Sequence, residues 1–258
     1  MAEKQFQAFR LQVPGEWDEF ARRNSDFVSH FPVLYESIEK INRISRTFTE
    51  ERESVIFFCL RASQEDFFEV ILLAGQGHGS GALARIRTMY ERIVHARYFM
   101  RFPKRFDDYL AFDIVSRRKL INEAKELFPD MWTTEQLNKF HTEYESTVQR
   151  FGSKGKLNAS WNEGLGQMAK AVGLGELYLY CYLLPSQYIH VTPNGILSSR
   201  GRGEEYNWGP ERELCDLATS HAHALLVIAL LESNDFLSAG LETDLQVLKD
   251  SCHLVWGA

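Results

Sequence analysis

Several features that would place the chain in a special class are absent or sparse. Its 258 residues include only seven prolines and four cysteines, and the cysteines lie far apart, at Cys59, Cys181, Cys215 and Cys252. Dispersed cysteines in mostly apolar surroundings indicate buried free thiols in a reducing compartment, and they exclude a disulfide framework as the main source of stability.

Long hydrophobic runs and an excess of positive charge are also missing. The longest apolar run, Ala222 to Leu231, is about half of the ~20 residues that a membrane helix needs. The N-terminal MAEKQFQAFR lacks the apolar core of a secretory signal. A net charge of −6 gives no general attraction for nucleic acid or an anionic membrane. We therefore expect a cytoplasmic protein with neither a membrane nor nucleic acid as its partner.

The sequence is instead rich in apolar residues at helical spacing. Hydrophobic residues make up 45% of the chain, and 18 Phe, 10 Tyr and 5 Trp predict a core packed with rings. No stretch alternates as a strand does, and no internal repeat is present. This pattern predicts an all-α single domain over residues 1–258, an irregular bundle of about eight to ten helices. Within it we place N-terminal helices in 1–50, a core in 51–232 and a C-terminal helix in 233–258.

Some local signals mark where helices begin and end. Pro32 is expected to end or bend the first helical region. Ser63 with Asp66 forms an N-cap signal, so residues 54–74 can be read as two short helices or one long one. The glycine-rich run Gly75–Gly81 favours a tight connection or a close crossing of helices. An anion cradle at a helix N-terminus is the alternative for that run.

The most informative stretch is the predicted helix from Gly79 to Met100. At helical spacing, one side of it carries Leu83, Arg87, Tyr90, Glu91, Val94 and Tyr98. Arg87 and Glu91 thus occupy places where a core-facing helix would carry leucine. A base four residues before an acid is the weaker order for stabilising a helix, so local stability does not explain the pair. His95 lies one further turn along, on the side of Glu91.

A second set of polar residues recurs at every fourth position. Tyr178, Tyr182, Ser186 and His190 would form one ridge on a continuous helix. Pro185 interrupts that ridge because it removes a backbone donor, but Ser186 and His190 both follow it and can face together. A hydroxyl, an imidazole, a phenol, a guanidinium and a carboxylate are the groups of a binding or acid–base site.

Both stretches resemble the signatures of one bacterial helical family, a domain of unknown function. The segment from Leu83 to Glu91 resembles L-x-R-S-x-x-E, with Thr88 where serine is usual. The spacing Tyr182-x-x-x-Ser186-x-x-x-His190 resembles Y-x-x-x-S-x-x-x-H-P, although here proline follows the histidine only at the third position, as Pro193.

The resemblance covers about Ser54 to Leu231. It implies that Arg87, Glu91, Ser186 and His190 come together, and it supplies no activity.

These residues lead to a predicted polar site that binds a small anionic ligand and can be hydrolytic. The catalytic candidates are His190, Ser186 and Glu91, and the ligand-binding candidates are Arg87, Tyr182 and His95. In the hydrolytic version His190 is the general base, and Ser186 or a water is the nucleophile. No cofactor and no metal are expected. Glu91, His95 and His190 or His221 could hold a metal, but the paired Glu-x-x-His motifs of di-iron bundles are missing.

Two alternatives stay open, as does the question whether the chain is an enzyme at all. In one, the chain is a helical binding or regulatory protein, with a homodimer left open, and the polar set only stabilises the core. In the other, Arg23-Asn24 followed by His30 resembles the Arg-x(4–6)-His motif of HEPN ribonucleases, which implies a role in stress or phage defence. The basic segment Ser198–Gly203 could also lie over an anionic ligand.

Overall fold

The computed structural model describes residues 14–153, 156–157, 164–190 and 210–256. Over these residues the protein is an all-α single domain with ten α-helices, which confirms the predicted class and helix number. The α-helices are α2 (Glu16–Arg23), α3 (Ser25–Asn42), α4 (Glu51–Gly75), α5 (Gly79–Arg101), α6 (Lys104–Leu127), α7 (Thr134–Phe151), α8 (Leu165–Ala171), α9 (Leu184–Ile189), α11 (Arg212–Leu237) and α12 (Glu242–Trp256). The shorter elements are a 3-10 turn η1 (Pro129–Met131), a π-helical turn η2 (Leu179–Leu183) and a two-stranded antiparallel hairpin of β1 (Gly152–Ser153) and β2 (Lys156–Leu157).

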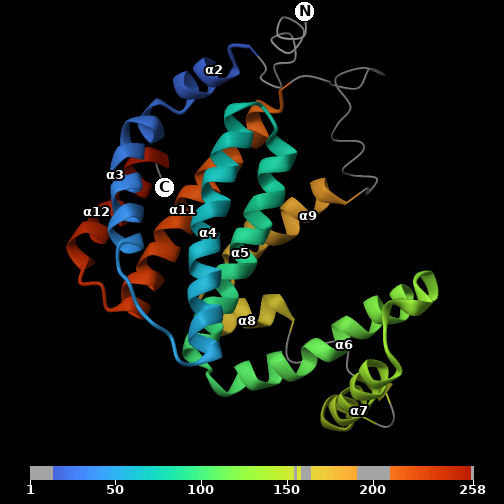
Figure 1. The fold of residues 1–258 in the computed structure, drawn as a ribbon. Helices are drawn as coiled ribbons and strands as arrows, with labels where there is room; N and C mark the ends of the chain where they lie inside the picture. Colours follow the sequence, from blue (N-terminus) through green and yellow to red (C-terminus); the bar gives the residue numbers. More distant parts are fainter. Residues whose placement is uncertain (1–13, 154–155, 158–163, 191–209, 257–258) are drawn as a thin grey trace, which may run out of the picture.

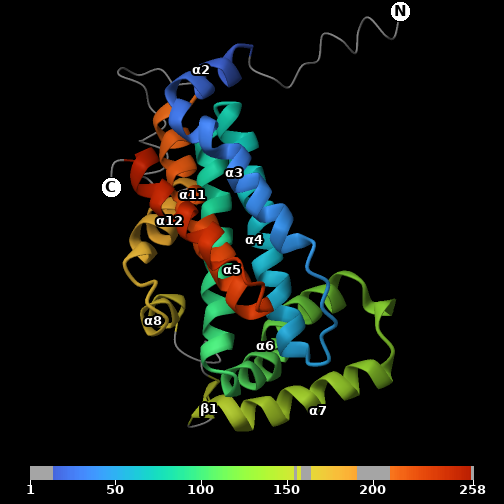
Figure 2. The ribbon, with the colours of Figure 1, turned by 90° about the vertical axis from the view of Figure 1, so that its left-hand side faces the viewer.

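Three long helices, α4, α5 and α11, lie side by side at the centre of the fold (Figures 1 and 2). The side chains of Leu83, Ile86 and Ile93 on α5 are completely buried, because this helix has neighbours on most of its circumference. Helices α3 and α12 cover α11 on one side, whereas α8, η2 and α9 cover α5 on the other.

The central helix α11 is also the one described helix long and apolar enough to cross a membrane by length and composition. More than half of its most apolar window is buried inside the fold, as in the core helix of a globular protein. Its residues Ala222, Leu225 and Leu226 are completely covered by other helices.

The glycine-rich run Gly75–Gly81 makes a close helix crossing. A Cβ on Gly79 would lie 2.5 Å from Leu214 Cβ and 2.7 Å from the Glu211 carbonyl oxygen, so α11 approaches α5 over a bare backbone. The N-terminus of α5 already has an anion: the backbone N–H of Ser80 donates to the Glu211 carboxylate at 2.7 Å. The run therefore serves packing, and its helix terminus binds a carboxylate of the chain itself.

Of the two alternatives for residues 54–74, the structure shows the single long helix, so Ser63 is not an N-cap. Residues 51–75 form one helix, α4, and the Ser63 hydroxyl donates to the Leu60 carbonyl inside it. Asp66, which would have completed the cap, is buried and lies 2.5 Å from Arg92 on α5. The packing of two neighbouring helices against this stretch therefore favours one continuous helix over the local N-cap signal.

The first break in the helical chain also lies elsewhere than predicted. Asn24 separates α2 from α3, and its side-chain amide donates to the Phe20 carbonyl and to Asp216 of α11. Pro32 lies inside α3 without ending it. An asparagine that bonds the preceding turn and another helix interrupts the chain more effectively than this proline does.

Helices α6 and α7 form an arm that extends from the lower end of α5, away from the central helices (Figure 1). Helix α7 packs chiefly on α6 and on the β1–β2 hairpin. Helix α7 begins with a capping box, in which Thr133 and Gln136 bond each other's backbone N–H groups.

Candidate functional site

Arg87 of α5 meets two residues from the segment that lies across it. Its Nη2 donates to the Tyr182 hydroxyl at 2.9 Å, and its Nη1 lies 3.3 Å from Nε2 of His190. The guanidinium carbon is also 4.5 Å from the centre of the Tyr182 ring. The fold thus brings together three of the predicted residues from segments 95 and 103 positions apart.

A π-helical turn lets the second segment reach Arg87 on both sides of a proline. Residues Leu179–Leu183 form η2, in which the backbone N–H of Leu184 bonds the carbonyl five residues earlier. Pro185 follows in the first turn of α9. Proline has no N–H and its ring collides with the carbonyl four residues back, and a widened turn accommodates both effects. The helix therefore continues past Pro185, so that Tyr182 and His190 contact the same guanidinium.

The Tyr182 ring is itself held by a second tyrosine. Tyr178 stacks on it with ring centres 5.1 Å apart and an interplanar angle of 16°. Gly166 of α8 lies against Tyr178, where a Cβ would come within 3.1 Å of the ring. Gly166 carries no signal in the sequence beyond being glycine, so only the packing of α8 reveals its part in positioning this pair.

Arg87 is oriented by uncharged groups and has only a distant acid. Its Nη2 lies 3.6 Å from the Glu91 carboxylate, beyond hydrogen-bonding distance. By contrast, Arg97 lies 2.8 Å from Glu232. The side chains of Arg87 and Glu91 are 25% and 37% exposed, so the pair lies at the edge of the buried stripe.

His190 directly follows α9 as its C-cap residue and is exposed. Arginine N–H groups only donate, so the Nε2 atom that faces Arg87 acts as the acceptor and the ring proton lies on Nδ1. That Nδ1–H is the group of His190 that can donate to a ligand.

Ser186 does not form the predicted nucleophile–base pair. Its hydroxyl donates to the Tyr182 carbonyl at 2.6 Å. The bond that joins Ser186 to His190 is a backbone one, from the His190 N–H to the Ser186 carbonyl at 3.3 Å, and among the described residues no side-chain hydrogen bond links the hydroxyl to the imidazole. Because the hydroxyl of Ser186 donates its proton to the helix backbone, no base is in place to remove that proton and make the oxygen a nucleophile.

His95 lies outside the group that surrounds Arg87. Its Nδ1 donates to the Glu91 carbonyl at 2.7 Å, and its ring packs against Phe99 and against Tyr109 of α6. Burial lowers the pKa of His95, although the Glu91 carbonyl and carboxylate oppose the shift. This histidine is held by its own helix and by the base of the arm, and the structure does not place it where a ligand at Arg87 could reach it.

The structure also shows where the residues considered for a metal site and for a nuclease motif lie. Among residues 14–153, 156–157, 164–190 and 210–256, no group of three or more His, Cys, Asp or Glu could hold a metal ion. Arg23 forms an ion pair with Asp216 at 3.0 Å, while His30 lies on the next helix. Pro193 and the basic segment 198–203 lie outside the described residues.

Comparison with known proteins gives a family but no function. A family model described as a family of unknown function, DUF5677, matches residues 53–207. The match includes Arg87 and the whole segment from Tyr178 to His190. Neither a curated protein nor a solved structure matches the chain significantly.

Proposed function

The chain belongs to the DUF5677 family, whose function is unknown, and from the surroundings of Arg87 we propose that it binds a small anionic ligand there. The ligand presents a carboxylate or phosphate group to the junction of α5 with α9. The four free cysteines are compatible with work in a reducing compartment such as the cytoplasm.

The observation that carries this proposal is that the Arg87 guanidinium is fixed in place while some of its N–H groups have no acceptor. Tyr182 and His190 contact two of its nitrogens and fix its plane. Glu91 forms an ion pair with Arg87 at 3.6 Å but accepts no hydrogen bond from it, and among the described residues Nε has no hydrogen-bond partner, so donors remain for a ligand. A pre-oriented, partly exposed guanidinium binds the paired oxygens of a carboxylate or phosphate at little entropic cost.

The neighbouring groups favour one anion of limited size. The Nδ1–H of His190 supplies a second donor, whereas the Glu91 carboxylate repels a second negative charge and can accept from a ligand hydroxyl. Hydrolysis receives less support than binding, because Ser186 donates to the backbone and His190 would have to leave Arg87 to act as a base.

Isothermal titration calorimetry with inorganic phosphate and with acetate tests the proposal. We expect binding by the wild-type chain, and at least about a tenfold loss of affinity in Arg87→Ala, from the removal of charge-assisted hydrogen bonds. Arg85→Ala is the matched control, since Arg85 lies on the same helix but pairs with Glu69 of α4 at 2.5 Å. This control should bind as the wild type does.

One other role would explain the same contacts. The bonds from Arg87 to Tyr182 and His190 join α5 to the segment around α9, and they could serve stability alone. If the wild-type chain binds neither anion at about 10 mM and Arg87→Ala only lowers the melting temperature, the structural role holds and the binding proposal is wrong.

A further inference from the structure

The tip of the α6–α7 arm exposes an unusual number of large apolar side chains. Leu120, Leu127, Phe128 and Met131 are between 60% and 72% exposed, all within twelve residues. Leu120 and Leu127 are seven residues apart and therefore lie on one face of α6. Concentrated apolar surface of this kind marks an interaction site more often than a solvated surface.

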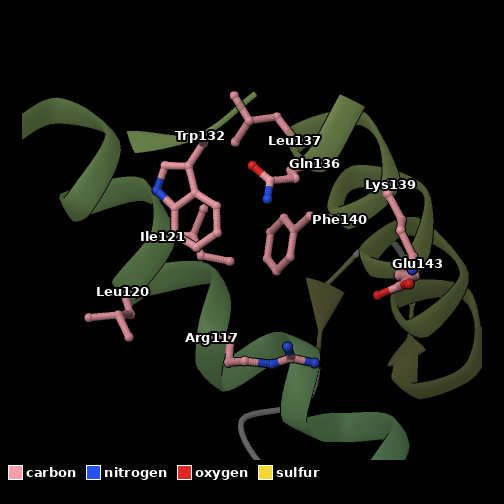
Figure 3. A pocket seen from close by; sticks show the side chains of 9 residues that line it. All are labelled: Arg117, Leu120, Ile121, Trp132, Gln136, Leu137, Lys139, Phe140 and Glu143. Atoms are coloured by element: carbon pink, nitrogen blue, oxygen red, sulfur yellow. The ribbon is translucent and has the colours of Figure 1, made fainter. Parts of the chain in front are cut away.

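The arm cannot cover this surface with its own residues. A cavity of about 470 Å³ opens between α6 and α7 beside Leu120, where Trp132 and Phe140 project toward Ile121 (Figure 3). The indole Nε1 of Trp132 is buried and has no hydrogen-bond partner within the described ranges. Two helices alone thus leave the distal arm with an incomplete core, and a four-helix arrangement would complete it.

The charges that flank the two leucines indicate what covers them. Arg117 lies three residues before Leu120, and Asp130 lies three residues after Leu127. When a second copy of α6 runs antiparallel, Leu120 meets Leu127 of the other copy, and Arg117 comes to the end of the other α6, beyond which Asp130 lies in the turn η1. A surface with this order of charges is complementary to itself under a two-fold rotation.

Both flanking charges are exposed to solvent. Arg117 is paired only within its own helix, with Asp113 at 2.7 Å, and both side chains are exposed. Asp130 forms no ion pair with any described residue. Lys125, the basic residue between the leucines, lies instead at a groove shared with Leu137 of α7, away from this face.

We propose that the surface formed by Leu120, Leu127, Phe128 and Met131 is a homodimer interface, in which a second copy of the chain packs its arm antiparallel against the first. The inference does not depend on the anion site, whose residues belong to α5, η2 and the end of α9 and not to the arm. The partner of the arm is therefore the same apolar surface on a second copy, in which the flanking charges run in the opposite order.

Sedimentation equilibrium at about 100 µM chain tests the interface. We expect a wild-type dimer, and a dissociation constant raised at least about tenfold in Leu120→Glu and in Leu127→Glu, because each buries a carboxylate in the apolar contact. Leu72→Glu is the matched control: Leu72 is 60% exposed but lies on α4, and this variant should remain a dimer. A monomeric wild type, or a dimer that both arm substitutions leave intact, would overturn the proposal in favour of another occupant.

Charge reversal tests the antiparallel alignment. Arg117→Asp and Asp130→Arg should each weaken the dimer about tenfold, and the double variant should restore it, since the reversed charges again face each other. Circular dichroism verifies that the helix content of each variant is unchanged. Failure of the double variant to recover the dimer rules out the alignment proposed.

Discussion

Arg87 contacts Tyr182 in two chemically different ways. Its Nη2 donates to the phenol oxygen at 2.9 Å, and its guanidinium carbon lies 4.5 Å from the ring centre. The hydrogen bond fixes the direction of the guanidinium, while the ring face supports its charge. Because one side chain supplies both contacts, two substitutions at Tyr182 can separate them.

Tyr182→Phe should reduce phosphate affinity by about two- to tenfold, because it removes the hydrogen bond and keeps the ring. Tyr182→Ala removes both contacts and should cost more than Tyr182→Phe. Calorimetric titration with inorganic phosphate measures both. Tyr180→Ala is the control, since the neighbouring Tyr180 faces His221 of α11. Equal affinities in all three variants and the wild type would show that Tyr182 does not position Arg87 for binding.

Stability should fall on acidification because His223 is buried in its neutral form. Its Nδ1 accepts from the Trp256 indole at 3.0 Å, and burial, with a smaller effect of His30, lowers the pKa of His223 from 6.5 to about 4. The unfolded chain binds this proton first as the pH falls. The contribution is therefore complete above about pH 6.5 and is lost progressively toward pH 4, at up to about 3 kcal/mol.

Urea unfolding at pH 7.5 and 4.5 measures this loss. We expect His223→Asn to show a smaller fall in the free energy of unfolding between the two pH values than the wild type shows. His141→Asn, which changes an exposed histidine on α7, should keep the wild-type difference. An identical difference in the His223 variant would contradict the assignment.

The buried carboxylate of Asp66 depends on Arg92. Asp66 is 2% exposed, burial raises its pKa, and the Arg92 guanidinium at 2.5 Å opposes that shift. Arg92→Met would leave the carboxylate buried with only Arg85 at 3.9 Å, and should cost about 3–5 kcal/mol in the free energy of unfolding. The double variant with Asp66→Asn should recover much of this loss in urea titrations. A single-variant cost under about 1 kcal/mol would show that Arg85 or water suffices.

Two glycines at the start of α5 should respond oppositely to alanine. Gly79→Ala places a Cβ 2.5 Å from Leu214 and should destabilise the fold by about 1–3 kcal/mol, because α11 cannot retreat without losing its packing. At Gly81 the nearest atom is 3.7 Å away, so Gly81→Ala should be neutral or stabilising by up to about 1 kcal/mol. Thermal unfolding compares the two, and equal melting temperatures would refute the close crossing.

A local cap signal predicts a helix start only where the packing of other helices does not override it. The capping box of Thr133 and Gln136 is a contact within one turn, so its residues are sufficient to predict it. The N-cap at Ser63 failed because burial between α4 and α5 outweighs a cap worth about 1 kcal/mol.

Local sequence patterns were also insufficient to predict the polar site. The approach of His190 to Arg87 was implied by the resemblance of two distant segments to the signatures of one family, and no periodicity could have placed them together. The structure does not bring His95 into contact with them. Eight residues of helix rotate by about 80° beyond two full turns, which carries its side chain from the site to the base of α6.

Apolar spacing by itself determined that this chain is helical, with about eight to ten helices, of which the described residues contain ten, because a helix must bury a continuous stripe whatever it packs against. The membership in a helical family of unknown function was likewise readable from two short segments. Only the tertiary structure decided that Arg87 is oriented by neutral partners, that Ser186 bonds its own backbone, and that α6 and α7 project with an uncovered apolar surface. These properties depend on which helices meet and at what distance, and helical periodicity contains no information about either.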